Sequence, residues 1–373
     1  MNGSEPQLVR TLGFDARAAL LDANRGIGRV TAELASCLLT RHEFEVKLFV
    51  PRNTEVPERW YREAAAVIEL PQPRRGAFLW DGPVWRWIMR RRPVDVLHLP
   101  AWGVPPGVPV PVVSTLYDVT PLRVPSAIPT TRTRHRAVQR LNTHRRATLV
   151  HAISKATAWD ASHALGISPQ CVRVAPLGVE PPPPADCEQH PRRHVLFVGG
   201  GDPHKRVDIL LEAWTSPEAL DLPPLVIAGA AATAPAALTA AEACPDRVSL
   251  VGIVDQPHLA ELYLEAHAVL LPSLWEGYGL PALEGMAAGA VPVVTPRGAL
   301  PEVGADAALY IPAAAPPTAW AEAVRRLMEN DTLRRRLATR GQQLASQRSW
   351  QATTDRLADI YSEAAARRRT SRI

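Results

Sequence analysis

The sequence is poor in cysteine, and its few cysteines are scattered. They lie at Cys37, Cys171, Cys187 and Cys244 of a 373-residue chain, and no two of them have the spacing of a metal-binding pair. This excludes a disulfide framework and a cysteine-based zinc site. Isolated thiols are typical of a reducing cytoplasm, which is the location that we expect.

Long apolar runs are also missing. No stretch of about eighteen apolar residues occurs, so we expect no transmembrane helix. The polar start of the chain lacks the apolar centre of a secretory signal. Yet 46% of the residues are hydrophobic, which allows a sizeable core and excludes disorder as the general state. The length suits two domains, and no internal repeat indicates a solenoid.

Basic residues are in slight excess, with a net charge of +5 and a pI near 9.3. This balance favours anionic substrates or a membrane surface. Asp81–Arg92 joins Trp85 and Trp87 to four arginines, and Arg132–Arg146 is a second basic segment. Either segment could make peripheral membrane contact, but core packing with solvated arginines is the preferred interpretation. No nucleic-acid recognition motif accompanies the charge, so nucleic acid is not expected.

The first half of the sequence alternates between strand-like and helix-like segments, which predicts a parallel sheet covered on both faces. The expected strands are Val9–Asp15, Phe44–Pro51, Val94–Pro100, Val110–Asp118, Thr148–Ser154 and Cys171–Pro176. The expected helices are Gly28–Arg41, Thr130–Ala147 and Ala156–Leu165. A run of prolines, Pro181–Pro184, then predicts a stiff extended linker.

The second half repeats the alternation. The expected strands are His194–Gly199, Leu225–Ala228, Val248–Ile253, Ala268–Pro272, Val291–Thr295 and Ala308–Ile311. The expected helices are Arg206–Trp214, Ala234–Ala243, His258–Ala266 and a helical tail from Thr318 onward.

The expected fold is therefore α/β, with two doubly wound, Rossmann-like domains. A cleft between them would bind ligands, because such sheets bind at the carboxyl ends of their strands. We expect an N-terminal acceptor-binding domain over residues 1–177, a linker over 178–193 and a donor-binding domain over 194–350. Residues 351–373 are expected to form a helix and basic tail that pack back on the first domain.

The most informative segment is Leu271–Val294. It predicts a buried strand, a loop and a helix that begins at Leu280. A helix N-terminus offers unpaired backbone N–H groups and a partial positive charge, so the N–H groups of Gly279 and Leu280 suit a diphosphate. Glu276 and Glu284 flank this corner and can accept hydroxyl hydrogen bonds on either side of it. Such an arrangement describes a nucleotide-sugar site.

The run E-G-Y-G-L-P-A-L-E-G-M-A-A-G resembles the Glu-x7-Glu signature of family 4 glycosyltransferases, which have the GT-B fold and retain anomeric configuration. The resemblance implies that Glu276 contacts the donor hexose and Glu284 the nucleotide ribose. Ser273, Gly277 and Tyr278 join the expected donor site. The alternative is an ordinary strand–loop–helix unit with solvated carboxylates, which the many matching positions disfavour.

A glycine-rich loop at residues 199–206 follows one expected strand and precedes a helix. Its glycines permit close approach to a ligand, and Lys205 supplies a charge for phosphate. The loop resembles the family's second phosphate-binding loop, in which a lysine and often an arginine contact the diphosphate. Gly200 stands where many relatives have the arginine, and Arg206 is the candidate replacement. The alternative is a turn with an exposed lysine.

Two further segments are candidate parts of the site. Gly26 and Gly28 precede an amphipathic helix, and the resemblance implies a loop that touches donor phosphate or acceptor; a plain tight turn is the alternative. Tyr117 and Asp118 end an expected strand where relatives often read His-Asp, so they are acceptor-side candidates, with a helix or turn cap as the alternative for Asp118. His151 is a further acceptor-side candidate, although it and His98 also suit buried strand ends.

The resemblance covers roughly residues 10 to 360. It implies a hexosyltransferase that moves a sugar from a GDP-mannose-like, UDP or dTDP donor to a saccharide, lipid-linked or small-molecule hydroxyl. The richness of the chain in Ala, Arg and Pro separately suggests a bacterial source with a high-GC genome. Glu276, Lys205 and Asp118 are the expected catalytic residues. No Asp-x-Asp pair occurs in the candidate site, so we expect no metal and no cofactor. The alternatives are a GT-B epimerase, a phosphorolytic enzyme or a non-catalytic nucleotide-sugar binder.

Overall fold

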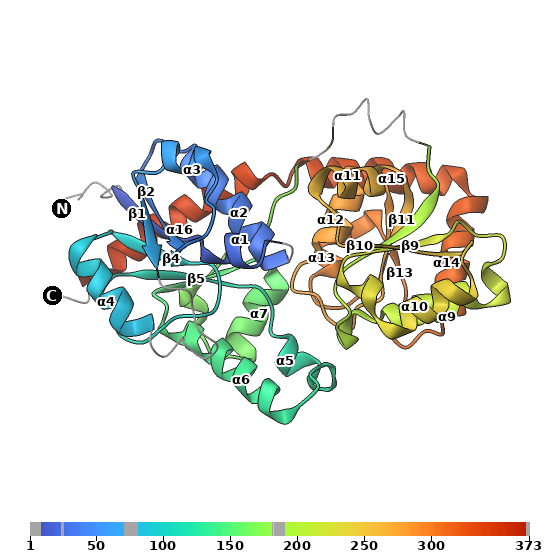
Figure 1. Cartoon of the computed structure of the whole chain (residues 1–373), viewed down its shortest axis with the longest axis horizontal. Helices are drawn as coiled ribbons and strands as arrows, with labels where there is room; N and C mark the ends of the chain where they lie inside the picture. Colours follow the sequence, from blue (N-terminus) through green and yellow to red (C-terminus); the bar gives the residue numbers. More distant parts are fainter. Residues whose placement is uncertain (1–8, 24–25, 71–80, 181, 183–190, 371–373) are drawn as a thin grey trace. The chain divides into compact units, whose positions relative to one another are not determined.

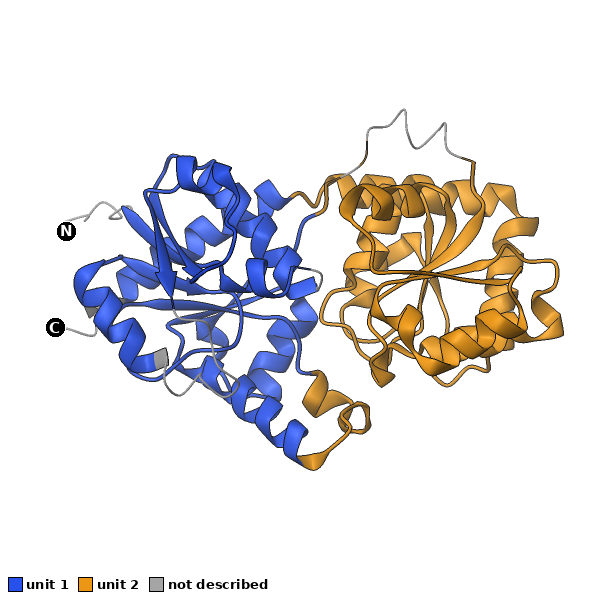
Figure 2. Ribbon diagram, in the orientation of Figure 1, with its two compact units in different colours: residues 1–119, 132–178, 350–373 blue, residues 120–131, 179–349 orange. Residues whose placement is uncertain are grey.

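The computed structural model describes residues 9–23, 26–70, 81–180, 182 and 191–370. The expected proline linker lies largely outside these residues, as do Arg25 and the last three residues. The chain divides into two compact units (Figure 2). Unit 1 consists of Met1–Val119, Arg132–Gly178 and Trp350–Ile373, and unit 2 of Thr120–Thr131 and Val179–Ser349.

Unit 1 is built on a seven-stranded parallel sheet in the order β3-β2-β1-β4-β5-β6-β7 (Figure 1). Its strands are β1 Thr11–Asp15, β2 Glu45–Pro51, β3 Ala66–Leu70, β4 Val96–Leu99, β5 Val112–Leu116, β6 Leu149–Ala152 and β7 Val172–Val174. The central strands are buried on both faces, which is why they read as continuous apolar runs. The sequence did not indicate β3, a half-buried edge strand with a weaker pattern.

The helices of unit 1 are α1 Arg17–Leu21, α2 Gly26–Leu39, α3 Glu58–Glu63, α4 Asp81–Arg91, α6 Thr131–Asn142, α7 Lys155–His163 and α16 Trp350–Thr370. The expected helix Thr130–Ala147 is shorter than predicted, because a 3-10 turn, Thr143–Arg146, follows α6. Helix α6 contains no buried residue. In the described part of the chain, no helix has the length and apolarity needed to cross a membrane.

Unit 2 has a six-stranded parallel sheet in the order β10-β9-β8-β11-β12-β13 (Figure 1). Its strands are β8 His194–Val198, β9 Leu225–Ala228, β10 Val248–Gly252, β11 Ala266–Leu271, β12 Val291–Val294 and β13 Leu309–Tyr310. Its helices are α5 Thr120–Arg123, α9 Val207–Thr215, α10 Pro235–Ala243, α11 Gln256–Leu264, α12 Leu280–Ala287, α13 Leu300–Gly304, α14 Thr318–Glu329 and α15 Asp331–Ser346.

One segment departs from the expected domain boundaries. Thr120–Thr131 was expected in the first domain, but it packs with unit 2. It holds α5 and a 3-10 turn, Pro125–Ala127, which contacts the 3-10 turn Pro203–Lys205 of unit 2. This packing was not predictable from local patterns, because the contact joins residues about eighty positions apart and depends on the tertiary fold.

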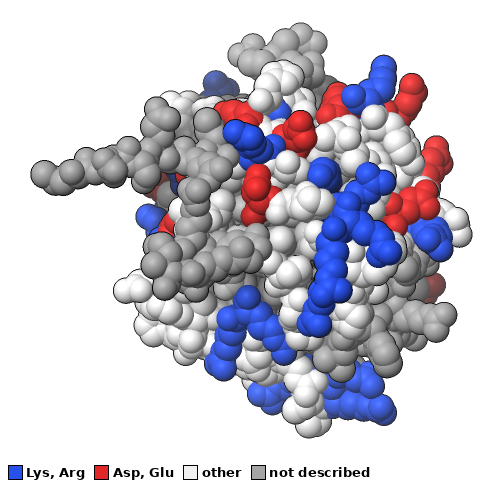
Figure 3. Space-filling view, turned by 90° about the vertical axis from the view of Figure 1, so that its left-hand side faces the viewer, with Lys and Arg blue, Asp and Glu red and all other residues white. Residues whose placement is uncertain are grey.

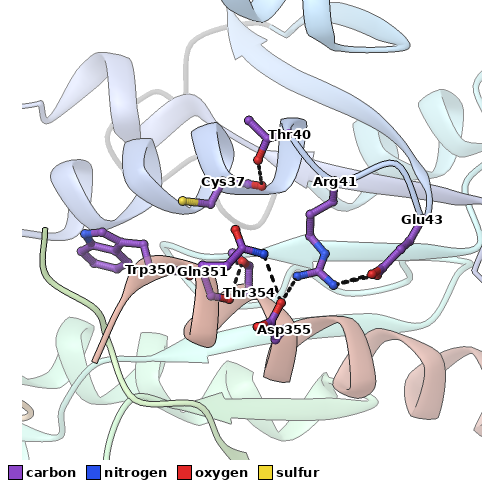
Figure 4. Close-up of polar contacts among 8 residues, drawn as sticks. All are labelled: Cys37, Thr40, Arg41, Glu43, Trp350, Gln351, Thr354 and Asp355. Atoms are coloured by element: carbon purple, nitrogen blue, oxygen red, sulfur yellow. Dashed lines mark hydrogen bonds and ion pairs between the residues drawn. The ribbon is translucent and has the colours of Figure 1, made fainter. Parts of the chain in front are cut away.

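The C-terminal helix α16 packs on unit 1, against α2, β4, β5 and β6. Its first turns are tied to the end of α2 through Arg41, which forms ion pairs with Glu43 and Asp355 (Figure 4). Gln351 donates a further hydrogen bond to Asp355 at 3.1 Å (Figure 4). Farther along, Glu363 pairs with Arg173 at 2.6 Å. These contacts explain why α16 belongs to unit 1.

Candidate functional site

The corner between β11 and α12 is shaped by two glycines. Gly279 has φ = 98°, a left-handed conformation that disfavours side chains, and a Cβ there would lie 2.6 Å from Leu300 Cδ2. Gly298 has φ = 59°, and a Cβ there would lie 2.1 Å from the backbone oxygen of Glu276. Helix α12 begins at Leu280, as expected, without a side-chain cap at Gly279. Its first N–H groups therefore suit an anion.

Glu276 lies in this loop and is only 8% exposed. Ser273 Oγ donates a hydrogen bond of 2.6 Å to its Oε1. Lys205 Nζ donates to both carboxylate oxygens, at 2.7 and 2.9 Å. Burial raises the pKa of Glu276, but the charge and hydrogen bonds of Lys205 and the Ser273 hydroxyl outweigh it, so the pKa lies below its usual value. The carboxylate is therefore charged at neutral pH.

The sequence suggested separate tasks for Lys205 and Glu276, but the structure joins them in one ion pair. The two loops that carry them are also connected through the backbone, because Leu274 N donates to His204 O at 2.8 Å. Lys205 is about one-quarter exposed, with 23% of its side chain accessible. An arriving diphosphate would meet a cation that already has an anionic partner in the same unit.

Gly200 stands where many relatives have a phosphate-binding arginine, and Arg206 is the candidate replacement. The structure shows what surrounds each of them. A Cβ on Gly200 would lie 2.8 Å from Asp202 Oδ2, so a side chain at this position would meet a carboxylate. Arg206 ends the loop with φ = 54°. Its Nε lies 3.1 Å from Asp208 Oδ2, so the guanidinium pairs with the first turn of α9 in this structure.

Glu284 lies in α12 and is also 8% exposed. Tyr263 Oη, from α11, donates a 2.6 Å hydrogen bond to its Oε2. Tyr263 is 4% exposed, and it is not among the site residues expected from the sequence. The sequence signal for Tyr263 is limited to its place in α11, the helix that precedes β11 and the Glu-x7-Glu corner. Among the other expected donor residues, Gly277 and Tyr278 are buried.

Segment 120–131 places a cation against an aromatic ring of this corner. The Arg123 guanidinium lies 5.1 Å from the ring centroid of Trp275, the residue before Glu276. The arrangement is a cation–π contact. Neither residue was indicated by the sequence, because the contact depends on segment 120–131 packing within unit 2.

The remaining candidates lie in unit 1. Gly26 and Gly28 form the first turn of α2, which begins two residues earlier than expected. Tyr117 and Asp118 follow directly after β5, as expected. The Tyr117 hydroxyl is buried near Thr31; burial raises the pKa of Tyr117, so the phenol stays protonated at neutral pH.

His151 lies in the core rather than on an acceptor surface. Burial lowers its pKa to about 4, so it is neutral at pH 7. Its Nε2 lies 2.7 Å from Ala175 O and must donate, which leaves Nδ1 to accept from Thr115 Oγ1 at 3.0 Å. Thr115 Oγ1 then accepts from His98 Nε2 at 2.8 Å, and His98 Nδ1 accepts from Tyr361 Oη at 2.7 Å. This chain of bonds uses both nitrogens of each ring.

The site of unit 2 therefore combines three chemical elements. It has a helix N-terminus for phosphate, an ion pair that contains a lysine, and two buried carboxylates that each accept a short hydroxyl hydrogen bond. Such carboxylates can accept hydrogen bonds from further hydroxyl groups. Within the described residues, no group of three or more His, Cys, Asp or Glu side chains could hold a metal ion.

Solved structures share this fold over nearly the whole chain. A sucrose-phosphate synthase from Thermosynechococcus elongatus matches with a TM-score of 0.75 and 18% identity, over 96% of this chain and 99% of that one. HepE from Anabaena, solved with UDP and glucose, matches with a TM-score of 0.69 and 17% identity, over 95% and 99%. At these identities the likeness shows the fold, which is the expected GT-B arrangement of two Rossmann-like sheets.

Sequence comparison indicates the family. An MMP alpha-(1->4)-mannosyltransferase of Mycolicibacterium hassiacum is 30% identical over 58% of this chain and 54% of its own length. The chain thus spans about half the length of that curated relative. The model described as "Glycosyltransferase Family 4" matches residues 24–181, and the model described as "Glycosyl transferases group 1" matches residues 187–344. Since the two models together account for most of both units, the chain belongs to glycosyltransferase family 4.

Proposed function

We propose that this protein transfers a hexosyl unit from a nucleoside-diphosphate sugar to an acceptor hydroxyl, with retention of anomeric configuration. The observation that carries the proposal is the corner at α12, where Glu276, paired with Lys205, and Glu284 flank an uncapped helix N-terminus. Unit 2 would bind the donor and unit 1 the acceptor. A family of glycosyltransferases and a mannosyltransferase relative support this assignment.

Each residue then has a distinct task. The backbone N–H groups at Gly279 and Leu280 bind the diphosphate together with Lys205, which moves its charge from Glu276 toward the phosphate. Glu276 accepts hydrogen bonds from the hexose hydroxyls, and Glu284 accepts them from the ribose. Once the donor is bound, these groups are already in place when charge develops on the leaving diphosphate, and they stabilise that charge.

The reaction needs no nucleophilic side chain. The acceptor oxygen forms a bond to the anomeric carbon on the face from which the diphosphate departs. The bond between that carbon and the phosphate oxygen breaks, its electron pair stays on the diphosphate, and a phosphate oxygen takes the acceptor proton. The protein contributes positioning and charge stabilisation. Tyr117 and Asp118, at the end of β5, are the proposed acceptor-side residues.

The donor class is a GDP-mannose-like, UDP or dTDP sugar, and the acceptor is a saccharide, a lipid-linked sugar or a small molecule. Thermal melting with a panel of nucleoside diphosphates and their sugars tests the donor assignment, because a ligand that binds the native state raises the melting temperature. Product analysis then separates the activities. An epimerase converts donor without acceptor, a phosphorolytic enzyme needs phosphate, and a simple binder produces no turnover; each result would contradict the proposal.

We expect activity without a divalent metal. The charge of the leaving diphosphate is met by Lys205 and by the N-terminus of α12, which together take the place of a metal ion. Initial rates measured after extensive dialysis against EDTA should equal those of untreated enzyme. Loss of activity that Mn²⁺ or Mg²⁺ restores would overturn this electrostatic assignment.

We also propose peripheral contact with an anionic membrane surface on the cytoplasmic side. Lys and Arg side chains gather in a band on one face of the molecule (Figure 3). In unit 1, α6 exposes Arg132, Arg136 and Arg140 in one stripe of i, i+4 spacing. On α4, Trp87 is 57% exposed and lies against the guanidinium of Arg91.

Replacing the three α6 arginines with glutamine should weaken binding to vesicles containing phosphatidylglycerol at least ~10-fold, since each basic residue near an anionic surface contributes about 1 kcal/mol. Vesicle co-sedimentation measures this, with phosphatidylcholine vesicles as the uncharged comparison. The matched control replaces Arg326, Arg335 and Arg336, which are exposed on unit 2. An equal loss in both variants would indicate general charge rather than this helix.

A further inference from the structure

The Tyr263–Glu284 pair joins a buried tyrosine hydroxyl to a buried carboxylate. The 2.6 Å separation is in the range of a charge-assisted O–H···O⁻ hydrogen bond. Tyr263 Oη therefore occupies Oε2 of Glu284 in the free protein. A glutamate has three rotatable side-chain bonds, and this contact restricts them before any ligand arrives.

The positions of the two residues are themselves fixed by a third side chain. Arg192 donates to Tyr263 O at 3.4 Å and to Ala266 O at 2.8 Å, and it also donates to Ala288 O at 2.8 Å. It thereby ties the end of α11 and the start of β11 to the end of α12, the helix that carries Glu284. The helix that carries Tyr263 and the helix that carries Glu284 are thus held together by the hydrogen bonds of Arg192.

We infer that Tyr263 is a positioning residue for Glu284 and that the pair gives the donor site its preference for an intact ribose diol. This inference rests on the proposed donor-binding role of Glu284. Tyr263 itself makes no contact with the nucleotide donor. It holds one carboxylate oxygen so that the carboxylate is already oriented when the ribose hydroxyls arrive, which reduces the ordering cost of binding.

The test compares a nucleoside diphosphate with its 2′,3′-dideoxy counterpart by isothermal titration. Wild-type protein should prefer the ribose form at least ~10-fold, because hydrogen bonds to a charged group are strong. Tyr263→Phe keeps the ring and removes only the hydroxyl. It should reduce this preference roughly threefold to tenfold while affinity for the dideoxy form stays within about twofold. In kinetics with the full donor, the loss should appear as a higher KM rather than as a lower kcat.

Four further variants make the result specific. Glu284→Ala should abolish the preference, and adding Tyr263→Phe to it should change nothing more, because the hydroxyl then has no carboxylate to orient. Glu284→Gln should give an intermediate preference, and it tests the same contact if Tyr263→Phe folds poorly. Tyr310→Phe is the matched control, since the Tyr310 hydroxyl bonds to Ala305 O outside this corner.

The outcomes distinguish the inference from the function on which it rests. If wild-type protein does not discriminate between the two nucleotides, the ribose role of Glu284 fails, and the inference fails with it. If wild-type protein discriminates but Tyr263→Phe weakens both nucleotides equally, the tyrosine has only a structural role. An unchanged preference in Tyr263→Phe would likewise overturn the inference while leaving the proposed function intact.

Discussion

Glu276→Ala is expected to lower turnover at least ~100-fold, which corresponds to about 2.7 kcal/mol of transition-state stabilisation. The proposed contact is to the hexose, where bonds break, so its loss should appear in kcat. Binding of the bare nucleoside diphosphate should persist or tighten. The reason is that Lys205, which donates to both Glu276 oxygens in the wild-type protein, would lose this carboxylate partner and turn toward phosphate.

Steady-state kinetics with full donor, beside isothermal titration with the diphosphate, measures both effects. Glu276→Gln is the conservative comparison, because it keeps the shape and one acceptor oxygen. Glu242→Ala, an exposed change on α10 of the same unit, is the matched control and should behave as wild type. If Glu276→Ala abolished diphosphate binding while Glu284→Ala did not, the roles of the two glutamates would be reversed.

Much of this architecture could be predicted because parallel sheets leave a clear local signature. Strands buried on both faces read as short apolar runs, and β9 has the expected bounds at Leu225–Ala228. The start of α12 was also predictable, since glycine followed by Leu-Pro has a local backbone reason to begin a helix. The Glu-x7-Glu pattern located the corner because both carboxylates lie close together along the chain.

The parts that could not be predicted depend on tertiary contacts. Lys205 and Glu276 are seventy-one residues apart, and nothing in either loop indicates that they form an ion pair. Tyr263 looked like an ordinary helical residue until α11 was placed beside α12. His151 shows how the structure separates two interpretations that the sequence left open. A histidine at a strand end is consistent with a ligand contact, and only its bonds to Thr115 and Ala175 place it in the core.

Lys205→Met is expected to lower kcat/KM by ~10²–10³, the range found when a preorganised charge or donor is removed from a transition state. Two losses combine in this variant. The diphosphate loses its cation, and Glu276 remains buried without the ammonium group that pairs with it. Lys205→Arg keeps the charge and should retain more activity, although its planar guanidinium cannot reproduce the geometry of the ammonium group. Kinetics of both variants against wild type measures the difference.

The pH dependence of Lys205→Met gives a second, independent measure of the ion pair. In wild-type protein, burial raises the pKa of Glu276, but Lys205 and Ser273 hold it below its usual value, so the carboxylate stays charged down to acid pH. Without Lys205, burial dominates and the pKa of Glu276 rises.

The acidic limb of the residual activity should therefore move to higher pH in Lys205→Met and stay near the wild-type position in Lys205→Arg. Rates measured from about pH 4 to 8 would show this shift if Glu276 titrates with the acidic limb. A large loss of activity with an unmoved acidic limb would mean that Lys205 serves the diphosphate alone and that its contact with Glu276 has no part in the reaction.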